Sequence, residues 1–98
     1  MSFVQIIEYR TKRVAEFDAL LEAWLEKSAG WRTATRGVRT KDRDNADTYL
    51  QIVEFPSFEK AMENSGRPET KEFSDKLAEL CEGPPKFRNL DVLSVEEM

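Results

Sequence analysis

The sequence contains no histidine and only one cysteine, Cys81, among its 98 residues. With one cysteine no disulfide can form within the chain, and without histidine a zinc site of the Cys/His type cannot be built. The same counts exclude a Ser-His-Asp or Cys-His catalytic pair and a haem held by a histidine of this chain. We therefore expect neither a metal nor a cofactor.

The sequence also lacks an excess of positive charge and a long hydrophobic run. Its 15 Lys and Arg residues face 19 Asp and Glu residues, a net charge of −4, so no basic field is available to neutralise the phosphates of a nucleic acid. The apolar runs are far shorter than the roughly 20 residues that span a bilayer, and the N-terminus does not have the pattern of a signal peptide. These absences predict a cytoplasmic protein that binds neither nucleic acid nor membrane.

What the sequence does contain is an ordinary apolar share of 40%, which predicts a folded chain, and its length fits one domain over residues 1–98. The hydrophobic period changes repeatedly along it. Strands are predicted at 3–10, 31–41, 48–55 and 87–95, and helices at 14–28 and from 58 to about 80, the second broken or kinked at Gly66-Arg67-Pro68. The order βαββαβ predicts a ferredoxin-like α+β fold, with two helices on one face of a four-stranded antiparallel sheet.

The strand residues divide by parity into two sets, because successive side chains point to opposite faces of a sheet. The uniformly aliphatic set is expected beneath the helices: Val4, Ile6, Leu50, Ile52, Leu90 and Val92. The other set mixes aromatic, aliphatic and polar side chains: Phe3, Gln5, Ile7, Tyr9, Tyr49, Gln51, Val53, Phe55, Phe87, Asn89, Asp91 and Leu93. An uncovered face this apolar indicates an interface, most simply with a second copy, so we expect a homodimer through the sheet faces with a small-molecule pocket between the sheets.

Polar and aromatic side chains near that second face are the candidate binding residues. They are Gln5, Tyr9, Trp31, Tyr49, Gln51, Asn64 and Asn89. Plainer structural roles stay open for them. Gln5 and Gln51 could hydrogen-bond each other, Asn64 could cap the helix that breaks beside it, and Trp31 could anchor the dimer interface.

Asp91 is the one carboxylate on the second face, and it is the candidate catalytic residue. Burial there would raise the pKa of its carboxyl group toward the range of a useful general base. The alternative is an ion pair with an arginine of the dimer partner. The basic run that includes Arg32, Arg36 and Arg39 falls on both faces of one strand, a pattern typical of a solvated edge strand.

The predicted order, the length and the open sheet face resemble the dimeric α/β-barrel superfamily. The segment Phe55-Pro56-Ser57-Phe58-Glu59-Lys60-Ala61-Met62-Glu63-Asn64, with Phe73 and Glu82-Gly83-Pro84-Pro85, is similar to the antibiotic biosynthesis monooxygenase (ABM) family. The resemblance implies a homodimer that oxygenates an aromatic or polyketide-like compound without metal or flavin.

In that chemistry an acidic phenol or enol loses a proton, and the resulting carbanion reacts with dioxygen. Ser65 stands where the family pattern commonly has a histidine, so any role of that histidine is absent here. The alternative function is a non-catalytic dimeric module that binds a ligand or a partner protein, because shared fold does not by itself imply shared activity.

Overall fold

The computed structural model describes residues 2–98, and its elements follow the predicted order with the second helix divided in two. They are β1 (Phe3–Arg10), α1 (Val14–Ser28), β2 (Arg36–Lys41), β3 (Thr48–Phe55), α2 (Phe58–Ser65), α3 (Pro68–Leu80) and β4 (Lys86–Asp91). The ferredoxin-like α+β architecture is confirmed.

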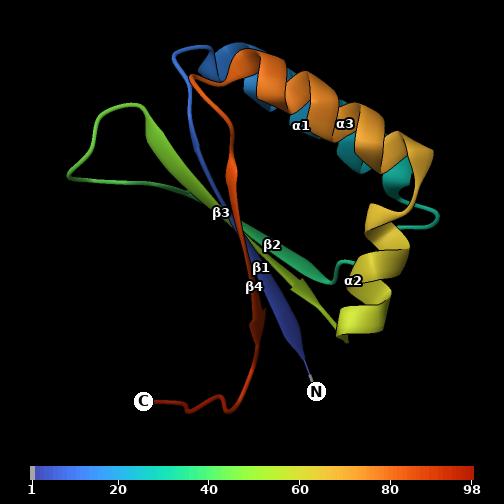
Figure 1. The fold of residues 1–98 in the computed structure, drawn as a ribbon. Coiled ribbons are helices and arrows are strands. Elements are labelled where there is room, and N and C mark those ends of the chain that lie inside the picture. Colours follow the sequence, from blue (N-terminus) through green and yellow to red (C-terminus); the bar gives the residue numbers. More distant parts are fainter. Residues whose placement is uncertain (1) are drawn as a thin grey trace.

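The division between α2 and α3 falls at the predicted break. The Ser57 hydroxyl accepts a hydrogen bond from the Lys60 amide (3.1 Å) and caps the start of α2. Pro68 occupies the first turn of α3, where its missing N–H costs nothing and its fixed φ suits a helix start. A new helix therefore starts at Pro68 in a new direction, and this turns α2 away from α3 (Figure 1).

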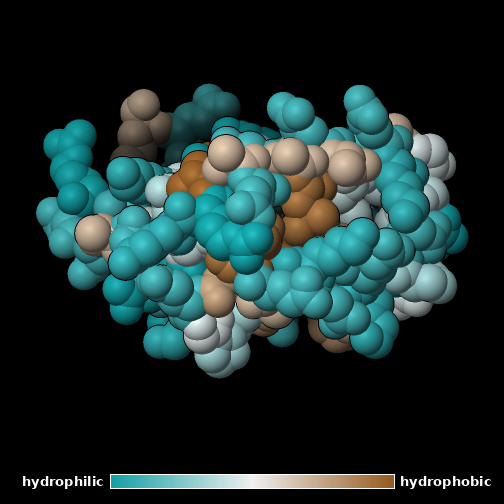
Figure 2. Space-filling model, turned by 90° about the horizontal axis from the view of Figure 1, so that it is seen from above, coloured by the Kyte–Doolittle hydropathy of each residue, from teal (hydrophilic) through white to brown (hydrophobic). Residues whose placement is uncertain are grey.

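The four strands form one antiparallel sheet in the order β2-β3-β1-β4, and the three helices lie on one side of it (Figure 1). Helices α1 and α3 run side by side, joined by an ion pair between Lys27 and Glu72 (3.6 Å). From above these two helices the surface is mostly hydrophilic, with apolar side chains gathered near its middle (Figure 2). None of the helices within residues 2–98 has the length and hydropathy needed to cross a bilayer.

The prediction of which sheet face lies beneath the helices is wrong. Phe3, Tyr9 and Phe55 belong to the set that was expected to be open, and all three are buried against helices. The aliphatic set instead lies on the face without helices, where it is partly exposed: Val4, Ile6, Leu50, Ile52, Leu90 and Val92. Both sets are apolar, so alternation separated them correctly but could not tell which one the helices cover.

Two aromatic clusters hold the helices to the sheet at opposite ends of β1. At one end Phe3 packs with Phe55 and Ala61 of α2, and its ring meets that of Phe58 edge-on at 5.5 Å. At the other end Tyr9 is stacked against Phe17 of α1, at 4.5 Å between ring centroids. Large rings fill the space between helices and sheet at both ends of β1, so the helices and the sheet are separated by a gap along its middle.

Two strand boundaries also differ from the prediction. The second strand begins at Arg36 rather than at residue 31, because the amides of Trp31 and Arg32 bond back to the Ser28 carbonyl at the end of α1 (3.0 and 2.7 Å). The last strand ends at Asp91 rather than at residue 95. Its neighbour β1 begins at Phe3, and within residues 2–98 the pairing continues past Asp91 only through the Val92 amide, which donates to the Ser2 carbonyl (3.0 Å).

Candidate functional site

A cavity of about 430 Å³ lies between the helices and the middle of the sheet. Its lining comes from every helix and every strand: Gln5, Ile7, Leu21, Trp24, Leu25, Arg32, Ala34, Thr35, Arg36, Gly37, Gln51, Val53, Phe55, Asn64, Ser65, Thr70, Lys71, Phe73, Ser74 and Phe87. Residues 3 and 9 of β1 fill the aromatic clusters at its two ends, which leaves Gln5 and Ile7 between them to line the cavity. The volume suits a small organic molecule.

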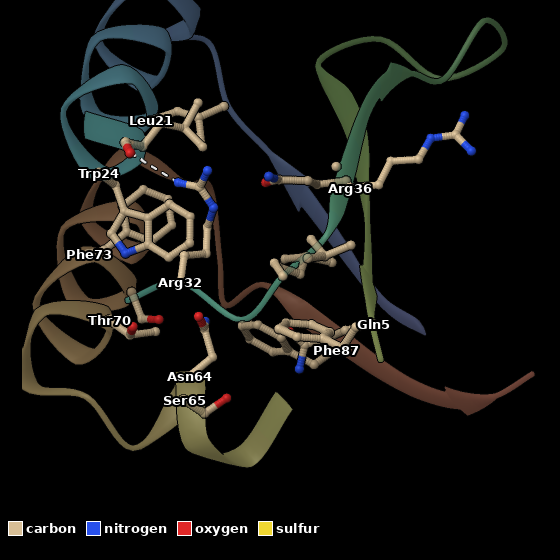
Figure 3. Close-up of a pocket in the computed structure, with 18 of the residues that line it drawn as sticks. Gln5, Leu21, Trp24, Arg32, Arg36, Asn64, Ser65, Thr70, Phe73 and Phe87 are labelled. Carbon is tan, nitrogen blue, oxygen red and sulfur yellow. Dashed lines mark hydrogen bonds between the residues drawn. The ribbon is translucent and has the colours of Figure 1, made fainter. Parts of the chain in front are cut away.

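Aromatic rings form opposite walls of this cavity. Trp24 of α1 and Phe73 of α3 pack against each other on the helix side, with ring centroids 5.2 Å apart, and Phe87 of β4 lies across from them (Figure 3). The Phe87 side chain is 52% exposed, so this side of the cavity is open to solvent. Rings on two sides favour a flat ligand, since aromatic groups gain from stacked or edge-to-face contacts.

Unpaired polar atoms gather around the same cavity. Gln51 Oε1, Trp24 Nε1 and Thr70 Oγ1 are buried and have no hydrogen-bond partner within residues 2–98. All three residues line the cavity. Leaving a buried polar group unpaired costs about 1–3 kcal/mol, so their grouping at one place indicates a position where a ligand would complete their hydrogen bonds.

Asn64 is buried at the end of α2 and lines the cavity. Its Oδ1 accepts a hydrogen bond from the Thr33 amide (3.3 Å), and this fixes the side-chain amide in place. Figure 3 shows the amide pointing from α2 toward Arg32. Because Oδ1 is occupied by the protein, the Nδ2 group is the part of Asn64 that can donate to a ligand.

Among residues 2–98, the charged side chains that line the cavity are all positive, namely Arg32, Arg36 and Lys71, and no carboxylate lines it. Arg36 pairs with Glu54 (3.5 Å) and points away from Trp24, and Lys71 pairs with Asp75 (2.9 Å) (Figure 3). In the part of the chain that the structure describes, no three His, Cys, Asp or Glu side chains come together to hold a metal ion.

Three of the predicted binding residues line this cavity: Gln5, Gln51 and Asn64. The predicted location of Gln5 and Gln51 between two sheets is wrong, because their side chains face the helices of their own chain. Gln5 and Gln51 do not bond each other. Gln5 Nε2 donates instead to Asn89 Oδ1 (3.1 Å), and the two residues are partners in the β1–β4 register. Asn64 does not cap α2, because Gly66 is the residue at the C-cap position.

The other predicted residues lie outside the lining. Tyr9 is buried in the core with Tyr49 stacked against it at 5.7 Å, and burial raises the pKa of the Tyr9 phenol above its ordinary value. Trp31 does not open a strand; its ring meets that of Trp24 edge-on and carries the Arg67 guanidinium at 4.2 Å. Asp91 is exposed at the end of β4, so the burial on which its proposed role as a base depended is absent from the chain.

Sequence reasoning missed Trp24, Thr70 and Arg32. Trp24 follows the helical spacing of core residues, and Arg32 belongs to the basic run that was assigned to a solvated strand. Thr70 carries no signal of its own in the sequence. Only the way in which α1 and α3 pack above the sheet brings the three to one cavity.

No protein-family model matches the chain, and neither does the sequence of any curated protein. Solved structures do match it. The cofactor-independent oxygenase SnoaB from Streptomyces nogalater, in an asparagine-to-alanine variant, has a TM-score of 0.81 at 13% identity, over 96% of this chain and 95% of that one.

Two further structures agree with this result. A candidate antibiotic biosynthesis monooxygenase from Caulobacter crescentus has a TM-score of 0.81 at 14% identity, over 95% of this chain and 91% of that one. A conserved protein from Methanosarcina mazei has a TM-score of 0.80 at 13% identity, over 92% and 91%. The chain therefore has the ferredoxin-like fold of antibiotic biosynthesis monooxygenase structures.

Proposed function

We propose that the chain is a cofactor-independent monooxygenase whose cavity binds a small aromatic or polyketide-like compound. The observation that carries this proposal is the cavity itself, which combines aromatic walls with the unpaired polar atoms of Gln51, Trp24 and Thr70. The shared fold with an oxygenase that needs no cofactor supports the class of reaction.

The reaction needs no bound redox group because the substrate supplies the electrons. In an anthrone-type substrate a ring CH₂ group loses a proton to give a carbanion stabilised as a phenolate. Dioxygen adds to that carbon as a peroxide, which then loses water to leave a ring C=O group. One oxygen atom thus enters the product, the other leaves as water, and CH₂ plus O₂ becomes C=O plus H₂O.

Asn64 is placed to assist this reaction. Its Nδ2 group can donate a hydrogen bond to the phenolate oxygen, on which negative charge accumulates as the carbanion forms. The Thr33 amide holds the Asn64 side chain in position before the substrate arrives, so no reorganisation is needed at the moment of reaction.

Oxygen uptake with anthrone- and quinol-type compounds in air tests the proposal. We expect uptake of one O₂ per substrate, and with ¹⁸O₂ one labelled atom in the product. Asn64→Ala should lower kcat about 100- to 1,000-fold, the cost of losing one donor to a developing oxyanion. Asn45→Ala is the matched control, because Asn45 lies in an exposed loop and donates only to Asp42.

Absence of uptake above the uncatalysed rate across such a panel would refute the oxygenase assignment. If the same compounds still bind, the chain is a non-catalytic ligand-binding module. In the part of the chain that the structure describes, the lining offers no carboxylate to act as a base, and this observation favours the second candidate.

We also propose that two copies associate through the sheet face that carries no helices. That face presents an aliphatic patch of partly exposed side chains: Val4, Ile6, Val38, Leu50, Ile52, Leu90 and Val92. Figure 1 shows the C-terminal segment leaving the sheet on the side away from α2, and its Leu93 and Val95 side chains are 88% and 85% exposed. A second copy would cover this apolar surface.

A further inference from the structure

Arg32 is held rigidly at the wall of the cavity. Its Nη1 group donates to the Leu25 carbonyl (3.0 Å) and to the Ser28 hydroxyl (2.8 Å), both in the last turns of α1. Its guanidinium carbon lies 5.7 Å from the centre of the Trp24 ring. Figure 3 shows the side chain between Trp24 and the strands, where a ligand in the cavity would meet it.

The charge of Arg32 is not neutralised by the chain. The ion pairs formed among residues 2–98 do not include it, although its side chain is half-buried. A guanidinium has five N–H donors, and both of its hydrogen bonds here come from Nη1. The Nε and Nη2 donors remain for a ligand, and they present the planar fork that suits a carboxylate or another ionised oxygen group.

The other cations of the lining do not compete for such a group. Arg36 is paired with Glu54 on the opposite sheet face, and Lys71 is paired with Asp75 of its own helix. Since no carboxylate lines the cavity, Arg32 is its one unneutralised charge within residues 2–98. Because the rings of Trp24 and Phe87 form opposite walls of the cavity, the anionic group is expected to be attached to an aromatic ring.

We propose that Arg32 determines the specificity of the cavity, which takes its ligand as an aromatic anion bearing a carboxylate, phenolate or enolate oxygen. This inference rests on the proposed function, in that the cavity is the ligand site. The further step is that Arg32 binds the ligand in its ionised form. The cavity then needs no acidic or basic side chain to take up or release a proton.

Calorimetric titration with 2-naphthoate and with its neutral isostere 2-naphthamide tests the inference. The wild-type protein should bind the anion about tenfold to a hundredfold more tightly, the range for a hydrogen bond to a charged group. Arg32→Gln should abolish the difference by weakening naphthoate alone, and Arg32→Lys should keep part of it. Arg43→Gln removes the same charge from an exposed loop outside the cavity lining and should leave both affinities unchanged.

Each other outcome has a distinct meaning. Equal affinity of the wild type for the two compounds would overturn the role of Arg32 while leaving the cavity as a site for aromatic molecules. An equal loss of both affinities in Arg32→Gln, with a native circular dichroism spectrum, would show that Arg32 only supports the end of α1. Binding of neither compound at millimolar concentration would overturn the proposed site as well.

Discussion

Replacing Gln51 by methionine should make the ligand-free protein more stable. Gln51 Oε1 is buried without a hydrogen-bond partner, which costs the folded state about 1–3 kcal/mol. Methionine has a similar unbranched shape and no oxygen to desolvate, so the change removes this cost without opening a void. Allowing for imperfect packing, we expect the free energy of unfolding to rise by about 1 kcal/mol, or the Tm by roughly 4–8 °C for a domain of this size.

Urea denaturation followed by circular dichroism measures this change, with wild type and variant at one protein concentration because association contributes to apparent stability. Gln5→Met is the matched control. Gln5 also lines the cavity, but its amide donates to Asn89, so its replacement should leave stability unchanged or lower it by up to about 1 kcal/mol. A Gln51→Met protein that is less stable than the wild type by 1 kcal/mol or more would refute the reasoning, since Oε1 would then be satisfied in the folded state.

Two further predictions concern the sheet face and the core. Ile52→Glu places a charge within the aliphatic sheet face and should convert a dimer of twice 11.4 kDa into a monomer in sedimentation velocity, whereas Ala19→Glu on the exposed side of α1 should not. A wild type that sediments as a monomer would contradict the proposed association. Thr11→Val removes a buried hydroxyl that donates to the Leu80 carbonyl (2.7 Å) and accepts from the Arg13 amide (3.0 Å). It should lower the free energy of unfolding by about 1–3 kcal/mol. As a control, Thr40→Val at an exposed position should change the free energy of unfolding by less than about 0.5 kcal/mol. Equal urea midpoints for these two variants would show that the Thr11 bonds do not matter.

The order of elements could be predicted from the sequence because each signal was local. Ser57 and Pro68 mark helix starts by the hydrogen bonds they can and cannot make, and the change of hydrophobic period separates strands from helices. The ends of the strands do not follow from such local signals. The extent of β4 depends on where its partner β1 begins, which is a property of the assembled sheet.

The orientation of the sheet could not be predicted, and the site moved with it. Alternation put Gln5 and Gln51 on one face correctly, but both faces of this sheet are apolar and local pattern does not say where the helices pack. The aromatic set lies beneath the helices, where Phe3 packs against α2 at one end of β1 and Tyr9 packs against α1 and α3 at the other. Arg32 was missed for a different reason: the basic run was assigned to a strand, whereas the turn that follows α1 places Arg32 beside Trp24.

A crystal structure of the protein with bound 2-naphthoate tests whether the ligand site lies between the helices and the sheet of one chain. We expect the naphthalene ring between Trp24 and Phe87, with its carboxylate on Arg32 and with Gln51 and Asn64 in contact. A ring bound on the Ile6 and Ile52 face, between two sheets, would contradict it. So would a cavity closed by Trp24 and Phe73 with the ligand absent from it.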